Sequence, residues 1–148
     1  MAETHVIQSR RLLHPRLIAP GAALLIAAFA TDLVYWRTLL FQWNNFSIWL
    51  IAAGLVLAAL AGLAVLMDVA RQRFGAMAWG RLAGFTVAAL LSLLNAFVHS
   101  RDAYTAVVPD GLLLSALVTV ILAILGWRGW SLSAGRRPHP SISAEARP

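Results

Sequence analysis

The sequence contains no cysteine and few charged residues. The absence of cysteine excludes disulfide bonds, thiolate metal sites and cysteine nucleophiles. Only 12% of the 148 residues are charged, whereas 60% are hydrophobic. A soluble domain of this composition would lack the polar residues needed to cover its surface. The composition therefore indicates a chain whose solvent is a lipid bilayer.

The positive charge of the chain does not indicate nucleic-acid binding. The net charge is +6, but all 12 basic residues are arginines that lie between or beyond the apolar runs rather than along one face. Catalytic signatures are missing too, since the sequence has no Gly-rich phosphate loop, no HExxH and no GxSxG. We therefore expect no nucleic-acid partner and no enzymatic activity.

Four apolar stretches are present, at about residues 17–36, 48–67, 82–98 and 112–127. Each is near the length that crosses a bilayer, and backbone groups in lipid must be satisfied internally, so we expect four helices. The connections, residues 37–47, 68–81 and 99–111, are short and make successive helices antiparallel neighbours. The predicted fold is all-α, a four-helix transmembrane bundle within residues 13–130. Residues 1–12 are predicted to be a flexible segment, and residues 131–148 a disordered tail.

Arginine is distributed unevenly between the two ends of the expected bundle. An even number of spans places both termini on one side together with the middle connection, and that side carries ten of the 12 arginines. The ten are Arg10, Arg11, Arg16, Arg71, Arg73, Arg81, Arg128, Arg136, Arg137 and Arg147. Only Arg37 and Arg101 lie on the other side. Because arginine accumulates on the cytoplasmic side, we expect both termini to face the cytoplasm.

Small residues recur along one face of the second stretch. Gly54, Ala58 and Gly62 are spaced by four residues, which forms two overlapping small-xxx-small steps. Such steps let membrane helices approach closely. We expect this face to pack against another span of the same chain.

One carboxylate, Asp32, interrupts the first apolar stretch. It lies roughly 22 Å along the expected helix at about 1.5 Å per residue, one or two turns inside the outer surface. Four polar residues near the end of the third stretch share one helix face: Ser92, Asn95, His99 and Asp102. An ionisable group in the bilayer usually faces the bundle interior and has a partner. We expect Asp32 to pair with this polar stripe or with Arg101.

Three interpretations of the polar cluster remain open at this point. The cluster can be an interhelical hydrogen-bond clamp that holds the first helix against the third. It can be a binding or proton-handling site that opens to the periplasm, with His99 titrating beside Asp32. It can also be a metal site formed by Asp32, His99 and Asp102, although nothing in the sequence fixes the ligand geometry.

Three segments carry a resemblance to a known family. The stretches "HPRLIAPGAALLIAAFATDL", "LLNAFVHSRDA" and "GWRGW" resemble the corresponding parts of the bacterial membrane-protein family called domain of unknown function 2231. The resemblance covers about residues 12–130 and implies a four-span inner-membrane domain without an established activity. In some relatives such domains are joined to redox modules, and extra histidines make haem binding conceivable. This chain has Arg81 but no histidine in "MAWGRLAGF", and none between "GWRGW" and His139.

These observations lead to an expected function and an alternative. We expect a non-enzymatic accessory or interaction module of the bacterial inner membrane, without a cofactor, in contact with the lipid bilayer and with another membrane or redox protein as a candidate partner. The alternative is a small haem-associated or proton- or ion-handling component that uses Asp32 and His99. His14, before Pro15, is expected to lie at the membrane interface, and Asp68 to form a solvated pair with Arg71. The oligomeric state is open.

Overall fold

The computed structural model describes residues 14–71, 79–101, 107–130 and 132. These residues form α1 (His14–Thr38), α2 (Phe41–Ala70), α3 (Trp79–His99), the short helix η1 (Val107–Gly111) and α5 (Leu112–Trp127). Four helical segments are long and apolar enough to cross a membrane, η1 and α5 together making the fourth. The described part of the chain contains no strand. The all-helical, four-span prediction is therefore confirmed. The terminal segments expected to be flexible or disordered lie outside the described residues, apart from Leu132.

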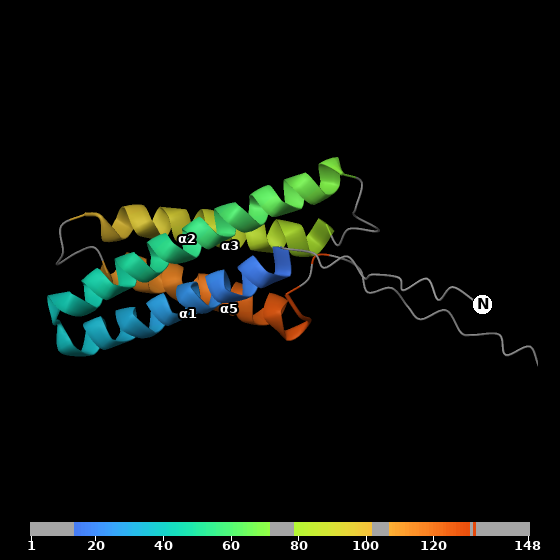
Figure 1. Cartoon of the computed structure of the whole chain (residues 1–148). Coiled ribbons are helices and arrows are strands. Elements are labelled where there is room, and N and C mark those ends of the chain that lie inside the picture. The colour runs from blue at the N-terminus through green and yellow to red at the C-terminus, as the bar shows by residue number, and fades with distance from the viewer. Residues whose placement is uncertain (1–13, 72–78, 102–106, 131, 133–148) are drawn as a thin grey trace, which may run out of the picture.

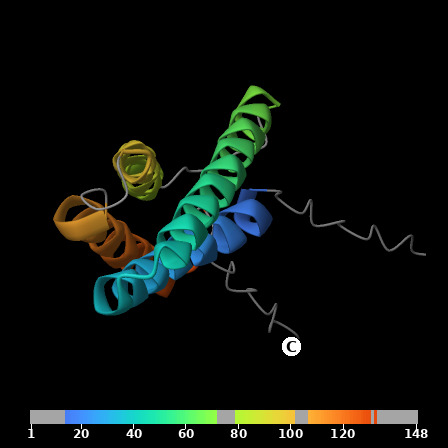
Figure 2. The same cartoon turned by 90° about the vertical axis from the view of Figure 1, so that its left-hand side faces the viewer.

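The helices alternate in direction along the bundle (Figure 1). α1 packs along α2 and also contacts α5, while α3 packs against α5. Figure 2 shows α2 crossing over α1 and standing apart from α3 at one end. We call the end where α1 and α3 finish the Asp32 end, and the end where α1 and α3 begin the His14 end.

The connection between α1 and α2 is much shorter than the sequence suggests. Only Leu39 and Leu40 separate the two helices, whereas residues 37–47 were expected to form a loop. The polar residues of "FQWNNFS" indicate a loop in the sequence, yet Asn44 and Ser47 are buried in the bundle, while Phe46 is exposed on the outside. The first turns of α2 are thus helical with a polar inner face. Because α2 begins at Phe41, Ser47 lies on a helix inside the bundle and not in a loop.

The interior of the bundle is made of small and medium-sized apolar residues. The core cluster comprises Ala22, Leu25, Ala28, Ile51, Ala88, Val118 and Leu122. Large apolar side chains such as Leu66, Leu113 and Ile124 are exposed instead. This distribution is typical of helices that pack closely in lipid and present bulky residues to the acyl chains.

The small-residue face of α2 meets α1 over only part of its length. A Cβ atom added at Gly54 would lie 2.8 Å from the Leu25 side chain and 3.2 Å from the Gly21 carbonyl oxygen. A Cβ added at Gly21 would lie 3.8 Å from the Ala58 backbone nitrogen. A Cβ added at Gly62 would meet nothing within 4 Å. The close approach therefore involves Gly54 and Ala58 but not Gly62, which is exposed. Nearer the His14 end the buried face of α2 is formed by Ala61 and Asp68 instead.

The segment after α5 turns back onto the bundle. Gly129 has a φ of +89°, a conformation that favours glycine, and its amide donates a hydrogen bond to the Gly126 carbonyl at 2.8 Å. This turn places the Trp130 ring against Gly126 and 6.3 Å from the Phe85 ring. In the "GWRGW" segment Gly129 therefore provides the turn and Gly126 leaves room for the Trp130 ring.

Candidate functional site

Asp32 lies at the point where all four spans meet. Its side chain is 0% exposed. Ser47 of α2 donates a hydrogen bond to Oδ1 at 2.5 Å, and Ser115 of α5 donates to Oδ2 at 2.5 Å. Nε2 of His99, on α3, lies 3.0 Å from Oδ1. The single carboxylate of α1 is therefore bonded to a side chain from each of the other three spans.

A second set of hydrogen bonds supports these partners. Asn95 donates from Nδ2 to the Ser115 hydroxyl at 2.7 Å. Nδ1 of His99 lies 3.0 Å from the backbone carbonyl oxygen of Asn95, one turn earlier on α3. Five side chains thus form one connected group, which we call the Asp32 network: Asp32, Ser47, Asn95, His99 and Ser115. The Asn95 side chain orients Ser115, and the Asn95 carbonyl orients His99. These two partners in turn hold the carboxylate in one position.

The contacts of His99 indicate where the network holds a proton. The Asn95 carbonyl can only accept, so Nδ1 of His99 carries a hydrogen. Nε2 faces a carboxylate oxygen, and this contact also needs a hydrogen. That hydrogen belongs either to Nε2 of an imidazolium or to a protonated Asp32. In both cases the His99–Asp32 pair has no net charge, which lowers the cost of enclosing it in the membrane.

The structure brings together only some of the residues expected at the site. Asn95 and His99 are in the Asp32 network, whereas Ser92 lies on the same face but donates to the Ala88 carbonyl of its own helix at 2.8 Å. Arg101 is exposed after the end of α3, and the partners of Asp32 within the described residues do not include it. Asp102 lies outside the described residues. The pairing of Asp32 is thus with the stripe rather than with Arg101.

Two members of the network, Ser47 and Ser115, are not predicted from the sequence. Ser47 was assigned to a loop, but α2 begins at Phe41 and carries Ser47 into the bundle. Ser115 is one hydroxyl within the apolar segment "LLLSALVTV", where serine is common in membrane helices and gives no specific signal. Ser115 lies about one turn inside the start of the fourth span, at the same depth as Asp32. This shared depth is the one sequence feature that indicates the pairing of the two residues.

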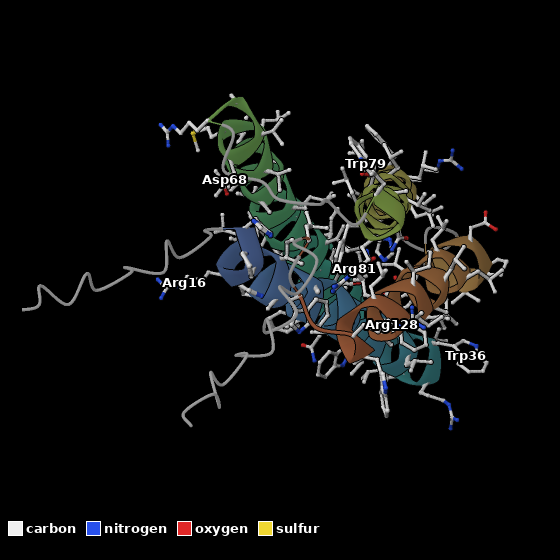
Figure 3. The ribbon with its side chains drawn as sticks, turned by 90° about the vertical axis from the view of Figure 1, so that its right-hand side faces the viewer. Arg16, Trp36, Asp68, Trp79, Arg81 and Arg128 are labelled. Carbon is white, nitrogen blue, oxygen red and sulfur yellow. The ribbon has the colours of Figure 1, made fainter. Side chains whose placement is uncertain are left out.

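A separate polar contact lies at the His14 end. His14 is fully buried, and its Nδ1 lies 3.8 Å from Oδ2 of Asp68 on α2. Nε2 of His14 accepts a hydrogen bond from the Leu132 amide at 3.2 Å. The expectation of a solvated Asp68–Arg71 pair is therefore wrong, because Asp68 is buried against His14. His14 begins α1 at the end of the bundle, where α2 and the turn after α5 close over its side chain. Figure 3 views this end and shows Asp68 on α2.

The described residues do not fit a haem held by two histidines. His14 begins α1 and His99 ends α3, so the two lie at opposite ends of the bundle, whereas axial ligands must share one iron. Both ring nitrogens of His99 already face oxygen atoms of the protein. Within the described ranges, no group of three His, Cys, Asp or Glu residues is placed to hold a metal ion. The described residues therefore fit neither a haem held by two histidines nor a metal ion held by three ligands.

Comparison with known proteins finds a matching family. The model of a family described as "Predicted membrane protein (DUF2231)" matches residues 10–139. This match confirms the resemblance seen in the first span, at the end of the third and after the fourth. No curated protein and no solved structure matches the chain.

Proposed function

Because this chain belongs to the domain of unknown function 2231 family of membrane proteins, we propose that it is a non-enzymatic accessory module of the bacterial inner membrane. One observation carries the proposal. The Asp32 carboxylate is fully enclosed and bonded to all three other spans. This arrangement is better suited to holding the helices together than to binding a substrate, which needs an accessible site.

The cavity of the bundle supports the same conclusion. A space of about 420 Å³ lies among α1, α2 and α3, and its walls are mostly apolar residues such as Leu17, Leu55 and Phe85. No residue of the Asp32 network lines it. A catalytic pocket needs several polar groups that converge on one open space. The Asp32 network and this apolar space therefore lie apart.

The orientation in the membrane is part of the proposal. The ten-to-two arginine distribution supports both termini in the cytoplasm. In this orientation the Asp32 end faces the periplasm and the His14 end faces the cytoplasm. A further membrane or redox protein is the partner that we propose for such a module.

The proposal is tested by making the whole network apolar. A buried polar network replaced as a unit by apolar residues of similar volume often leaves a fold intact, since no group is left unpaired. The combined variant carries Asp32→Leu, Ser47→Ala, Asn95→Leu, His99→Phe and Ser115→Ala. If it folds, as judged by circular dichroism and thermal unfolding in detergent, we expect it to restore growth of a deletion strain in competition cultures. A folded variant that fails to restore growth would show that the network has a chemical role.

A second candidate function rests on the His99–Asp32 contact. A histidine in hydrogen-bond contact with a carboxylate, in a site enclosed by the bundle, is an arrangement that a proton-handling component uses. In that case vesicles containing the wild-type protein should dissipate an imposed pH gradient faster than vesicles containing Asp32→Asn. Asp110→Asn, which changes an exposed carboxylate at the same end, should behave as wild type. Leakage equal to that of empty vesicles for the wild type would exclude this function.

A further inference from the structure

Arg81 is a partly buried cation, and two of its side-chain nitrogens are enclosed without an acceptor in the described part of the protein. It is the third residue of α3, at the His14 end, and its Nε and Nη2 atoms are buried without a hydrogen-bond partner. Figure 3 shows its side chain directed inward, between α3 and α5, whereas Arg16 points away from the bundle. A guanidinium enclosed without a partner is costly. The position therefore calls for an anion.

The described residues do not supply that anion near Arg81. It has six acidic residues, and the described ones are Asp32, Asp68 and Asp110. Asp32 and Asp110 lie at the opposite end of the bundle, and Asp68 faces His14. The segment between α2 and α3, residues 72–78, has the sequence "QRFGAMA" and contains no acidic residue. No carboxylate of the described residues is therefore placed to pair with Arg81.

A cleft next to Arg81 offers room for such a group. It has a volume of about 800 Å³, lies between the start of α3 and the end of α5, and is lined by Arg81 and Arg128 together with apolar residues that include Ile124 and Trp127. Trp127 is 94% exposed, and Trp79, at the start of α3, is 72% exposed. Exposed tryptophans mark the level of the lipid headgroups. The cleft thus combines two cations with an apolar wall at headgroup depth.

We propose that this cleft binds the phosphate of an anionic phospholipid, with Arg81 and Arg128 donating to the phosphate oxygens. Guanidinium groups match the geometry of phosphate and bind it through charge-assisted hydrogen bonds. Basic pockets between membrane helices on the cytoplasmic side suit acidic headgroups. The apolar wall at Ile124 and Trp127 favours a lipid over a free phosphate, because it provides a surface for the glycerol and the first carbons of the acyl chains. The site is independent of the Asp32 network, which lies at the other end.

The test measures lipid binding to the full chain in detergent. The purified protein is titrated with phosphatidylglycerol, with phosphatidylcholine and with inorganic phosphate, and binding is followed by native mass spectrometry and by the thermal unfolding midpoint. We expect phosphatidylglycerol to bind and to raise the midpoint, and the other two to have no comparable effect. An equal effect of phosphatidylcholine, or of inorganic phosphate, would overturn the proposal of an anionic lipid site.

Two variants and a matched control assign the binding to the cleft. Arg81→Gln and Arg128→Gln should each weaken phosphatidylglycerol binding by about ten- to hundred-fold, the loss expected for a hydrogen bond to a charged group. Arg16→Gln removes the same charge from an exposed position at the same end and should leave binding unchanged. Arg128 is itself exposed, so Arg128→Gln keeps the test valid if Arg81→Gln does not fold. Equal affinity of Arg128→Gln and Arg16→Gln would contradict the assignment.

Discussion

At the scale of single residues, Asp32 decides how the interior of the bundle is organised. Its two carboxylate oxygens accept hydrogen bonds from hydroxyl groups on two different helices, and one of them also contacts His99. Removing such an acceptor leaves buried donors without a partner, which costs more than the bond itself contributes. The consequence of a substitution at Asp32 therefore depends on what the new side chain can accept.

Two substitutions of Asp32 should differ in their effect on stability. Asp32→Leu leaves Ser47, Ser115 and His99 without their acceptor and should lower the free energy of unfolding by about 1–3 kcal/mol. Asp32→Asn keeps a hydrogen-bonding group of nearly the same shape and should cost less than Asp32→Leu. Thermal unfolding in detergent, measured for both variants and the wild type, gives the comparison. Equal stability of all three proteins would mean that the carboxylate does not hold the helices together.

The sequence predicts part of this site for physical reasons that can be named. Helical spacing places Asn95 and His99 on one face, and counting along the spans places Asp32 at their depth. The sequence does not show which nearby polar group completes the set. Arg101 is close along the chain but exposed, whereas Ser115 is distant in sequence and bonded to Asp32. Partner choice depends on how the helices rotate and cross, which a single sequence does not specify.

At the scale of helices, the contact of α1 with α2 depends on glycine at one position. Gly54 faces α1 at close range, whereas Gly62 is exposed and has open space where a side chain would lie. The sequence pattern treats both positions alike, since the spacing of four residues is the same. The extent of the four spans follows from hydropathy, but the crossing angle and the early start of α2 do not.

Alanine substitutions at the two glycines should have opposite effects. Gly54→Ala places a methyl group 2.8 Å from Leu25 and 3.2 Å from a backbone oxygen, so the helices must move apart, at a cost of about 1–3 kcal/mol. Gly62→Ala meets no atom within 4 Å and should be neutral or stabilising by up to about 1 kcal/mol, because alanine favours the helix. Unfolding midpoints in detergent report the difference. A Gly54→Ala protein as stable as Gly62→Ala would show that the helices do not approach as described.

At the scale of the whole molecule, the proposed orientation places the Asp32 end of the bundle at the periplasm and the His14 end at the cytoplasm. Reporters fused after residue 148 and inserted at Arg71 should appear cytoplasmic, since the arginine-rich side stays inside. A reporter between Leu39 and Leu40 should appear periplasmic. This two-residue connection is a better insertion point than Asn44, which is buried within α2. A periplasmic reporter at residue 148 would contradict the proposed orientation.

The central claim is that the Asp32 carboxylate holds all four spans together through hydrogen bonds. Double-mutant cycles in detergent test this claim most directly. Asp32→Leu is combined in turn with Ser47→Ala, His99→Phe and Ser115→Ala, and the free energy of unfolding is measured for each single and double variant. We expect a coupling energy of about 0.6 kcal/mol or more for each of the three pairs, the size typical of interhelical hydrogen bonds in membranes. Arg101→Gln is the control and should show no coupling to Asp32→Leu. Additive effects for all three partners, or coupling to Arg101 of the same size, would contradict the account.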